Sequence, residues 1–348
     1  MTTIVIDAMG GDHGPEPAIQ AAATLSLLEN SPGLCVVGDR DQLAPLLARH
    51  AHDPSRLRLQ HAAQTVLMED VPSEALQHKP DASIAIAARV VAEGGGDALV
   101  SAGNTGAVLL AASRHLGRLD GVRRAALAAV YPTETRRGEK QDPFSLLLDV
   151  GATLDATADE LVTFAVMGSA YASLISSNPR PRVALLSNGS EAHKGTQAIV
   201  EAHRRLRQHP GIHFIGNVEG VDIPRGTADV VVTGGFVGNV VLKMLEGVSE
   251  TVVGLARFAY RRRLSWKVAL WMLSSGIREL KSFTDWQQYG GAPILGLDRL
   301  CIKAHGRSSP RALQNAIKLA AKATRNDLVQ AIRRGLGEVP PGPSLPEA

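Results

Sequence analysis

Two stretches of the sequence, residues 97–110 and 229–242, share one strand–turn–helix pattern at an offset of 132 residues. In the first stretch, the apolar run 98–100 is typical of a short strand buried on both faces of a parallel sheet. Small and polar residues follow this run, and apolar residues then recur at helical spacing. The second stretch repeats this order, with glycines at the matching positions 103/235 and 106/238. The repeat predicts an α/β fold built from two related halves.

Both turns are candidate anion sites. A helix that begins just after a strand leaves free backbone N–H groups, and the helix dipole adds partial positive charge there. Ligands of open α/β sheets bind outside the carboxyl ends of the strands, so we expect both turns to face one cleft. The expected substrate-binding residues are Ser101, Asn104, Thr105 and Gly106 from the first unit, and Asn239 and Lys243 from the second. Taken alone, either turn is equally consistent with a tight connection that binds nothing.

Three further turns carry residues suited to chemistry on anions. Gly10 and Gly11 would let the backbone approach a ligand, and Asp12 would orient a base or fix the turn. Lys194, just before a helix, could place its ammonium over a phosphate or thioester oxygen. His305 follows an apolar strand and is a candidate acid, base or anion ligand. A solvated lysine and a capping histidine are the structural alternatives.

Composition excludes several classes of protein. The chain of 348 residues is 45% hydrophobic but only 4% aromatic, which favours a core of small aliphatic residues. A net charge of +3, without basic residues interleaved with aromatic ones, argues against nucleic-acid binding. The spacing G-x-G-x-x-G is absent after the first strand, which argues against a dehydrogenase. Cys35 and Cys301 lie in apolar runs and are expected to be buried thiols in a cytoplasmic protein.

The remaining pattern predicts one catalytic domain over residues 1–335, followed by a disordered Pro-rich tail at 336–348. Further strands are expected at 4–6, 34–38, 57–59, 125–131, 145–150, 182–186, 213–216 and 300–302. Residues 60–80 and 289–296 read as irregular, 133–143 as a charged hairpin or loop, and 310–332 as one long helix. Residues 161–179 carry no charge but are too polar for lipid, and Thr157 and Glu160 form a capping-box pattern before them. We therefore expect a buried helix there.

A basic helical segment is expected at about 249–284. Such a segment can lie on an anionic membrane, bind an acidic protein or form a dimer interface. The residues expected to make this contact are Arg261, Arg262, Arg263, Lys267, Leu270 and Trp271.

Six motifs in fixed order resemble one family. They are Asp-Ala-Met-Gly-Gly-Asp (7–12), Val-Ser-Ala-Gly-Asn-Thr-Gly (100–106), Leu-Asp-Val-Gly-Ala (148–152), Gly-Phe-Val-Gly-Asn-Val-Val-Leu-Lys (235–243), Tyr-Gly-Gly-Ala-Pro (289–293) and Ile-Lys-Ala-His-Gly (302–306). Together they look like the bacterial phosphate acyltransferases of the PlsX type, over roughly residues 3–330.

The resemblance implies a Rossmann-like α/β/α fold, akin to phosphotransacetylases and isocitrate dehydrogenases, in a homodimer that binds the membrane peripherally. It implies transfer of a fatty acyl group from acyl-carrier protein to inorganic phosphate for phospholipid synthesis, without a cofactor or a metal. In that reaction Asn104 and Thr105 would hold phosphate, Lys194 would neutralise developing charge, and Asp12 and His305 would orient phosphate or move a proton. Neither cysteine lies in a polar turn, so we expect direct attack by phosphate on the thioester.

Three departures from the family pattern keep other functions open. Thr153 stands where the family has Asn, Gly234 where it has Asp, and the acidic run before Lys194 is reduced to residues 190–192, with His193 following. A divergent or non-catalytic paralogue that binds the membrane or a carrier protein is one alternative. A phosphotransacylase that uses coenzyme A is another, although the basic segment favours an acidic carrier protein.

Overall fold

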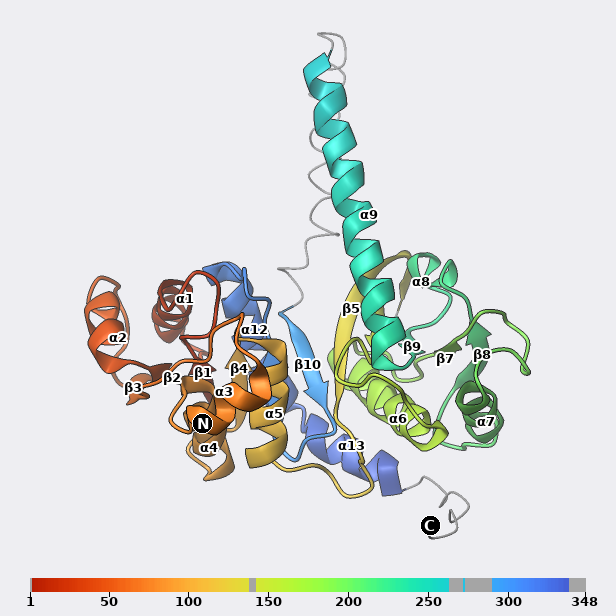
Figure 1. Cartoon of the computed structure of the whole chain (residues 1–348), viewed down its shortest axis with the longest axis horizontal. Coiled ribbons are helices and arrows are strands. Elements are labelled where there is room, and N and C mark those ends of the chain that lie inside the picture. Colours follow the sequence, from red (N-terminus) through yellow and green to blue (C-terminus); the bar gives the residue numbers. More distant parts are fainter. Residues whose placement is uncertain (1, 138–141, 263–271, 273–289, 338–348) are drawn as a thin grey trace.

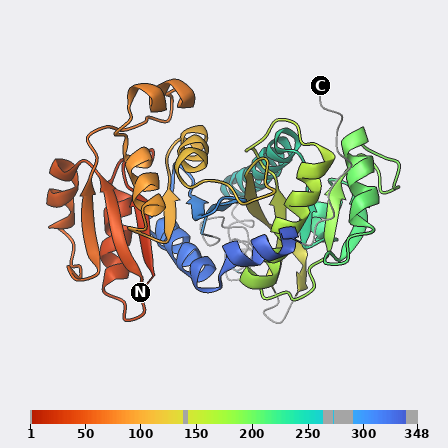
Figure 2. The ribbon, with the colours of Figure 1, turned by 90° about the horizontal axis from the view of Figure 1, so that it is seen from below.

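The computed structural model describes residues 2–137, 142–262, 272 and 290–337. Within these residues, one 11-stranded sheet carries helices on both faces (Figures 1 and 2). The strands are β1 (Thr3–Asp7), β2 (Gly33–Gly38), β3 (Leu57–His61), β4 (Ala98–Ser101), β5 (Ala126–Arg137), β6 (Asp142–Leu148), β7 (Val183–Leu186), β8 (Phe214–Val218), β9 (Val230–Val232), β10 (Ala292–Leu295) and β11 (Leu300–Lys303).

The described helices are interspersed with the strands along the chain, as expected for an α/β protein. They are α1 (Glu16–Ser26), α2 (Arg40–Leu47), α3 (Pro72–His78), α4 (Ser83–Ala92), α5 (Thr105–His115), α6 (Ala158–Ile175), α7 (Gln197–Leu206), α8 (Asp222–Arg225), α9 (Gly235–Arg262), α12 (Pro310–Arg325) and α13 (Leu328–Gly337). The capping box predicted for α6 is present, with Thr157 and Glu160 each accepting from the other's backbone N–H.

The sheet contains two parallel blocks joined by antiparallel strands. Its order is β3-β2-β1-β4-β11-β10-β5-β6-β9-β7-β8. The first block consists of β3, β2, β1, β4 and β11, and the second block of β6, β9, β7 and β8. Between them, β10 and β5 pair antiparallel with each other and with their outer neighbours. Figure 1 shows these two strands between the two parts of the molecule.

The register brings the carboxyl ends of both blocks to one level. Cys301 of β11 pairs with Ile294, which in turn pairs with Leu127 of β5. One residue farther along β5, Ala128 pairs with Leu148, the last residue of β6. Because β6 runs opposite to β11, the two blocks approach this level from opposite directions and both end there. Turns that follow the strands of both blocks can therefore share one site.

Small aliphatic side chains hold the layers together, as the composition predicts. Every residue of β4, β7 and β9 is buried, which fits the continuous apolar runs read from the sequence. Alternate residues of each strand point to opposite faces, so Ile4 and Ile6 join one apolar cluster and Val5 joins the other. Cys35 and Cys301 are buried free thiols, as predicted. The predicted α/β class with a mostly parallel sheet is confirmed.

Several predicted elements differ from the observed ones. The single helix predicted at 310–332 is wrong: Asp327 adopts φ 54° and separates α12 from α13. The region 289–296 contains β10, and the region 60–80 contains α3. Helix α13 reaches Gly337, two residues beyond the predicted limit of the domain. In Figure 2, α12 and α13 cross from the first block to the second, where α13 packs on α6.

Helix α9 extends well away from the body of the molecule (Figure 1). It covers the start of the predicted basic segment and includes Arg261 and Arg262 at its end. The predicted contact residues Arg263, Lys267, Leu270 and Trp271 lie outside the described residues. Among the helices that the structure describes, none combines the length and the apolar character needed to cross a bilayer.

Candidate active site

Three neighbouring strands of the first block end in a row of buried polar residues. Asp7 of β1 pairs in register with Ser101 of β4, which pairs with Lys303 of β11. The exposed fractions of these three residues are only 4%, 0% and 7%. The Ser101 hydroxyl donates to Asp7 Oδ2 at 2.7 Å and accepts the Gly103 N–H at 3.0 Å. Ser101, predicted to bind substrate, thus lies beneath the turn and fixes its backbone.

The turns above this row pack closely on one another. A Cβ atom at Gly10 would lie 2.6 Å from the Gly103 Cα, so only glycine allows this approach. The Asp12 N–H donates to the Gly306 carbonyl at 3.0 Å. The Asp12 carboxylate lies so close to Gly306 that a Cβ there would come within 2.6 Å of Oδ1. The structure thus brings the turn 8–14, including Gly11, together with the turn 304–309.

Burial shifts the pKa values of Asp7 and Lys303. It raises the pKa of Asp7, against the lowering effect of the Ser101 and Ser83 hydroxyls. It lowers the pKa of Lys303 to about 8, although the nearby Asp12 and Asp7 carboxylates raise it. Lys303 also donates to the Ala304 carbonyl oxygen. An amine with such a pKa changes charge within the range in which enzymes work.

His305 lies on the same turn and is a neutral base at pH 7. Burial, followed by the charges of Lys303, Arg307 and Lys243, lowers its pKa. Its Nδ1 accepts the Arg307 N–H at 3.2 Å, so the neutral ring carries its proton on Nε2. The influence of Lys243, which belongs to α9, shows that this turn lies near the second block.

Asn104 has a structural task at the start of α5. Its Oδ1 accepts the Ala107 N–H at 3.2 Å as the N-cap, and its Nδ2 donates to the carbonyls of Met68 and Asp70. Gly106 lies under Pro72, whose Cγ would be 2.6 Å from an added Cβ. Thr105 is the first residue of α5 and is partly buried. The turn is therefore fixed both from below, by Ser101, and from the side, by the segment 68–72.

The second block has its own arrangement of backbone around a buried carboxylate. Asp149 accepts N–H groups from Leu127, Gly151, Ala152 and Thr153 at 2.8–3.1 Å. The matching glycine of the second unit, Gly238, lies beneath it, and a Cβ there would be 1.9 Å from the Asp149 carbonyl oxygen. The matching glycines 106 and 238 thus serve one purpose, which is to let another segment pass close to a helix start.

Asn239 and Lys243 lie on α9 above this group. Because α9 begins at Gly235, they belong to its second and third turns, whereas the sequence predicts the first. Asn239 packs near Gly151, with its Cβ 3.7 Å from the position of an added Cβ. Lys243 forms an exposed ion pair with Glu246 at 2.8 Å.

Lys194 lies on the loop between β7 and α7. Its Cγ packs over Gly189, where a Cβ would lie 2.9 Å away, and its N–H donates to the Glu191 carbonyl. Because β7 runs parallel to β9, this loop leaves the same edge of the sheet as the turn at 233–235. Lys194 has no described contact with Asp12 or His305.

The departures at 153 and 234 fit their surroundings. Thr153 is buried, and its hydroxyl oxygen accepts the Gly235 N–H at 3.1 Å, as an Asn oxygen could. An added Cβ at Gly234 would meet its nearest neighbour, in Ala156, at 3.6 Å, an ordinary contact. Both positions therefore support the start of α9 without distortion.

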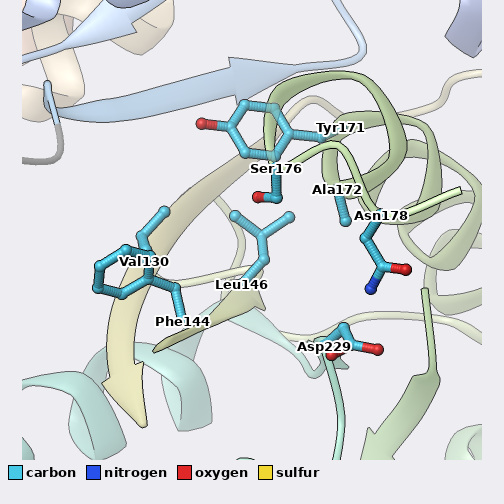
Figure 3. Close-up of a pocket in the computed structure, with 8 residues that line it drawn as sticks. All are labelled: Val130, Phe144, Leu146, Tyr171, Ala172, Ser176, Asn178 and Asp229. Carbon is cyan, nitrogen blue, oxygen red and sulfur yellow. The ribbon is translucent and has the colours of Figure 1, made fainter. Parts of the chain in front are cut away.

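A hollow between the β5–β6 hairpin and α6 is not part of this site. Figure 3 shows its mainly apolar lining, with Tyr171 and Asp229 on opposite sides. Its volume of about 20 Å³ suits a single water-sized group. Asp229 directly precedes β9, so the hollow lies at the amino end of that strand, and Arg182 already holds this carboxylate at 3.2 Å.

Lys303 and Asp149 were not among the residues predicted for the site. Both follow buried apolar runs at strand ends, which is the signal that could have found them. With them, the candidate site offers two sets of backbone N–H groups, the buried Lys303 and a neutral imidazole, with Lys243 of α9 near that imidazole. Lys194 leaves the same edge of the sheet as the second set. This arrangement can bind a small anion and stabilise a developing oxyanion.

Comparison with solved structures assigns the class of fold. A phosphotransacetylase from Streptococcus pyogenes matches with a TM-score of 0.62 over 94% of each chain, at 16% identity. A branched-chain phosphotransacylase from Enterococcus faecalis V583 matches with a TM-score of 0.55, covering 93% of this chain and 99% of its own, at 17% identity. The chain thus has the α/β fold of these acyl-transferring proteins.

Sequence comparison then gives the family. The family model described as "Fatty acid synthesis protein" matches residues 2–331. A phosphate acyltransferase from Myxococcus xanthus is 42% identical, covering 96% of this chain and 93% of its own. One from Dictyoglomus turgidum is 37% identical, covering 97% of this chain and 98% of its own. The chain belongs to the phosphate acyltransferase family, whose members are acyltransferases.

Proposed function

We propose that this protein transfers a fatty acyl group from acyl-carrier protein to inorganic phosphate, giving acyl phosphate for phospholipid synthesis. The observation that carries the proposal is the common level at which both parallel blocks end. The turns that follow the first block would bind the phosphate anion. The residues that follow the second block would stabilise the oxyanion. Membership of the phosphate acyltransferase family also supports this proposal.

The proposed reaction is one direct displacement. A phosphate oxygen attacks the thioester carbonyl carbon, the carbonyl oxygen becomes an oxyanion, and the carbon–sulfur bond breaks to release the carrier thiolate. The turns at 8–14, 101–106 and 304–309 bind phosphate, while Lys194 and Asn239 stabilise the oxyanion. The Nε2–H of neutral His305 donates to a phosphate oxygen, and the proton of monoprotonated phosphate passes to the leaving carrier thiolate. Both cysteines are buried, and burial raises their pKa values, so neither suits an acyl-enzyme intermediate.

Helix α9 supplies the proposed interaction surface. An apolar stripe runs along it, and each of its members is more than half exposed: Phe236, Val240, Met244, Val248, Val252, Leu255 and Phe258. An apolar surface of this length marks an interface. We infer that it contacts a second copy of the chain in a homodimer or the inner face of the cell membrane. We expect the basic residues from 261 onward to bind an acidic carrier protein, anionic lipid or a membrane acyltransferase.

Release of the carrier thiol tests this reaction. We expect thiol release from fatty acyl-carrier protein only when inorganic phosphate is present, with acyl coenzyme A a poorer donor. One equivalent of thiol released per site without phosphate would instead indicate an acyl-enzyme. A clear preference for short acyl coenzyme A would favour the phosphotransacylase alternative suggested by the structural neighbours.

A further inference from the structure

Lys303 is buried where stability alone does not require a charge. It ends β11 inside the register row with Asp7 and Ser101, and only 7% of its surface is exposed. Removing an ammonium from water is costly, and an apolar residue of similar size often serves packing better. Because this free-energy cost has no evident benefit for stability, we look for its benefit in function. Lys303 lies directly below the two turns proposed to bind phosphate.

The groups that face Lys303 come from every neighbouring segment. Asp12 acts on it from the turn after β1, Asp7 from β1 itself and Cys301 from β11. His305 faces it from the following turn, where the lysine charge acts on the imidazole. Because Asp12 also lies against Gly306, the ammonium attracts a side chain that packs between the two turns.

The space between the turns shows on which side a phosphate must lie. Asp7, Gly11, Gly306 and Ser308 line a hollow of about 10 Å³ there, which is water-sized at most. Phosphate is too large for it and must bind in front of the turns. Lys303 thus acts on phosphate from behind them, through their backbone and Asp12.

We propose that Lys303 is a positioning residue for phosphate: its ammonium holds Asp12 and the two glycine turns in place and supplies their positive charge, so that phosphate binding takes up a proton whenever Lys303 is neutral. This inference rests on the proposed function, because it takes phosphate to be the acceptor.

The proposal predicts a specific pH dependence. Lys303 has a pKa of about 8, and a bound phosphate dianion favours the charged amine and raises that pKa further. Phosphate binds the protein in which Lys303 is protonated. The affinity for phosphate therefore falls as the pH rises through about 8, and the fall approaches tenfold per pH unit. His305 and Cys301 do not account for this limb, because His305 has a lowered pKa and Cys301 one of about 12. Burial raises the pKa of Asp7, and Asp7 is retained in the Lys303→Met variant, so a limb that persisted in that variant would belong to Asp7.

The experiment is calorimetric titration of the full-length protein with inorganic phosphate, in buffers of differing ionisation enthalpy, from about pH 7 to about pH 9.5. We expect wild-type protein to take up a proton near pH 9 and none near pH 7. Lys303→Met should bind phosphate at least about tenfold more weakly at pH 7, with no uptake at any pH. Lys303→Arg should restore binding, without uptake and without the decline above pH 8, because guanidinium stays charged. Lys318→Met, an exposed lysine on α12, is the matched control.

The outcomes separate this inference from the proposed function. Wild-type binding without proton uptake, or unchanged uptake in Lys303→Met, would overturn the inference while leaving phosphate as the acceptor. No phosphate binding by folded wild-type protein would contradict both. If Lys303→Met fails to fold, the wild-type uptake and the Lys303→Arg profile still decide the matter.

Discussion

Lys194 differs from the other cations of the site because it comes from the loop after β7. We expect Lys194→Met to lower kcat/KM for acyl phosphate formation by about a hundredfold, as loss of one oxyanion donor does. Phosphate affinity should change little, since the residue is proposed to act on the thioester oxygen. Steady-state kinetics with phosphate titration measure both effects, and Lys318→Met is the control. Near-native turnover in Lys194→Met would remove the residue from the mechanism.

Variants at Thr153 test whether this departure from the family pattern affects stability or activity. Its hydroxyl oxygen accepts the buried Gly235 N–H, so Thr153→Val leaves that donor without a partner. We expect a loss of about 1–3 kcal/mol of unfolding free energy, measured by chemical denaturation. Thr153→Asn keeps an oxygen acceptor and should retain both stability and activity. Equal stability of the Val variant and wild type would show that the hydrogen bond contributes nothing.

At the scale of elements, the start of α9 requires glycine at position 238 but not at position 234. A Cβ at Gly238 would lie 1.9 Å from the Asp149 carbonyl, whereas one at Gly234 meets ordinary contacts. We expect Gly238→Ala to cost at least about 2 kcal/mol of unfolding free energy or to prevent folding. Gly234→Ala should remain near wild type in thermal unfolding. The reverse ranking of the two variants would contradict the described packing of α9 on the turn after β6.

The apolar stripe of α9 predicts an interface. Met244→Glu places one charge in it, and Val253→Glu, nine residues farther along, places one on the opposite side of the helix. We expect the stripe variant to lose self-association in ultracentrifugation, or binding to anionic vesicles in co-sedimentation, while the control keeps both. Retention of both properties by the stripe variant would mean that the interface lies elsewhere.

Most elements could be predicted from local pattern, and the exceptions have physical causes. The continuous apolar runs of β4 and β9 and the capping box of α6 determine their own structure. By contrast, β10 contains Pro293 and is defined by pairing with strands distant in sequence, which local propensity cannot reveal. The break at Asp327 interrupts an otherwise continuous helical pattern with a single left-handed residue.

At the scale of the whole molecule, the site could be predicted only in part. The glycine turns follow from residues at strand ends. A common cleft was expected from the repeat, but the antiparallel pairing through β10 and β5 that joins the two blocks could not be predicted. Lys303 was missed for a related reason, since only the register shows that it joins Asp7 and Ser101 in one buried row.

The most direct test of the account is formation of acyl phosphate by the purified protein. Long-chain acyl-carrier protein and inorganic phosphate would be supplied, and the product trapped with hydroxylamine as the hydroxamate. The account predicts a hydroxamate that requires the protein, the carrier-bound thioester and phosphate together. Absence of this product from folded wild-type protein, with acyl coenzyme A run in parallel and equally inactive, would contradict it.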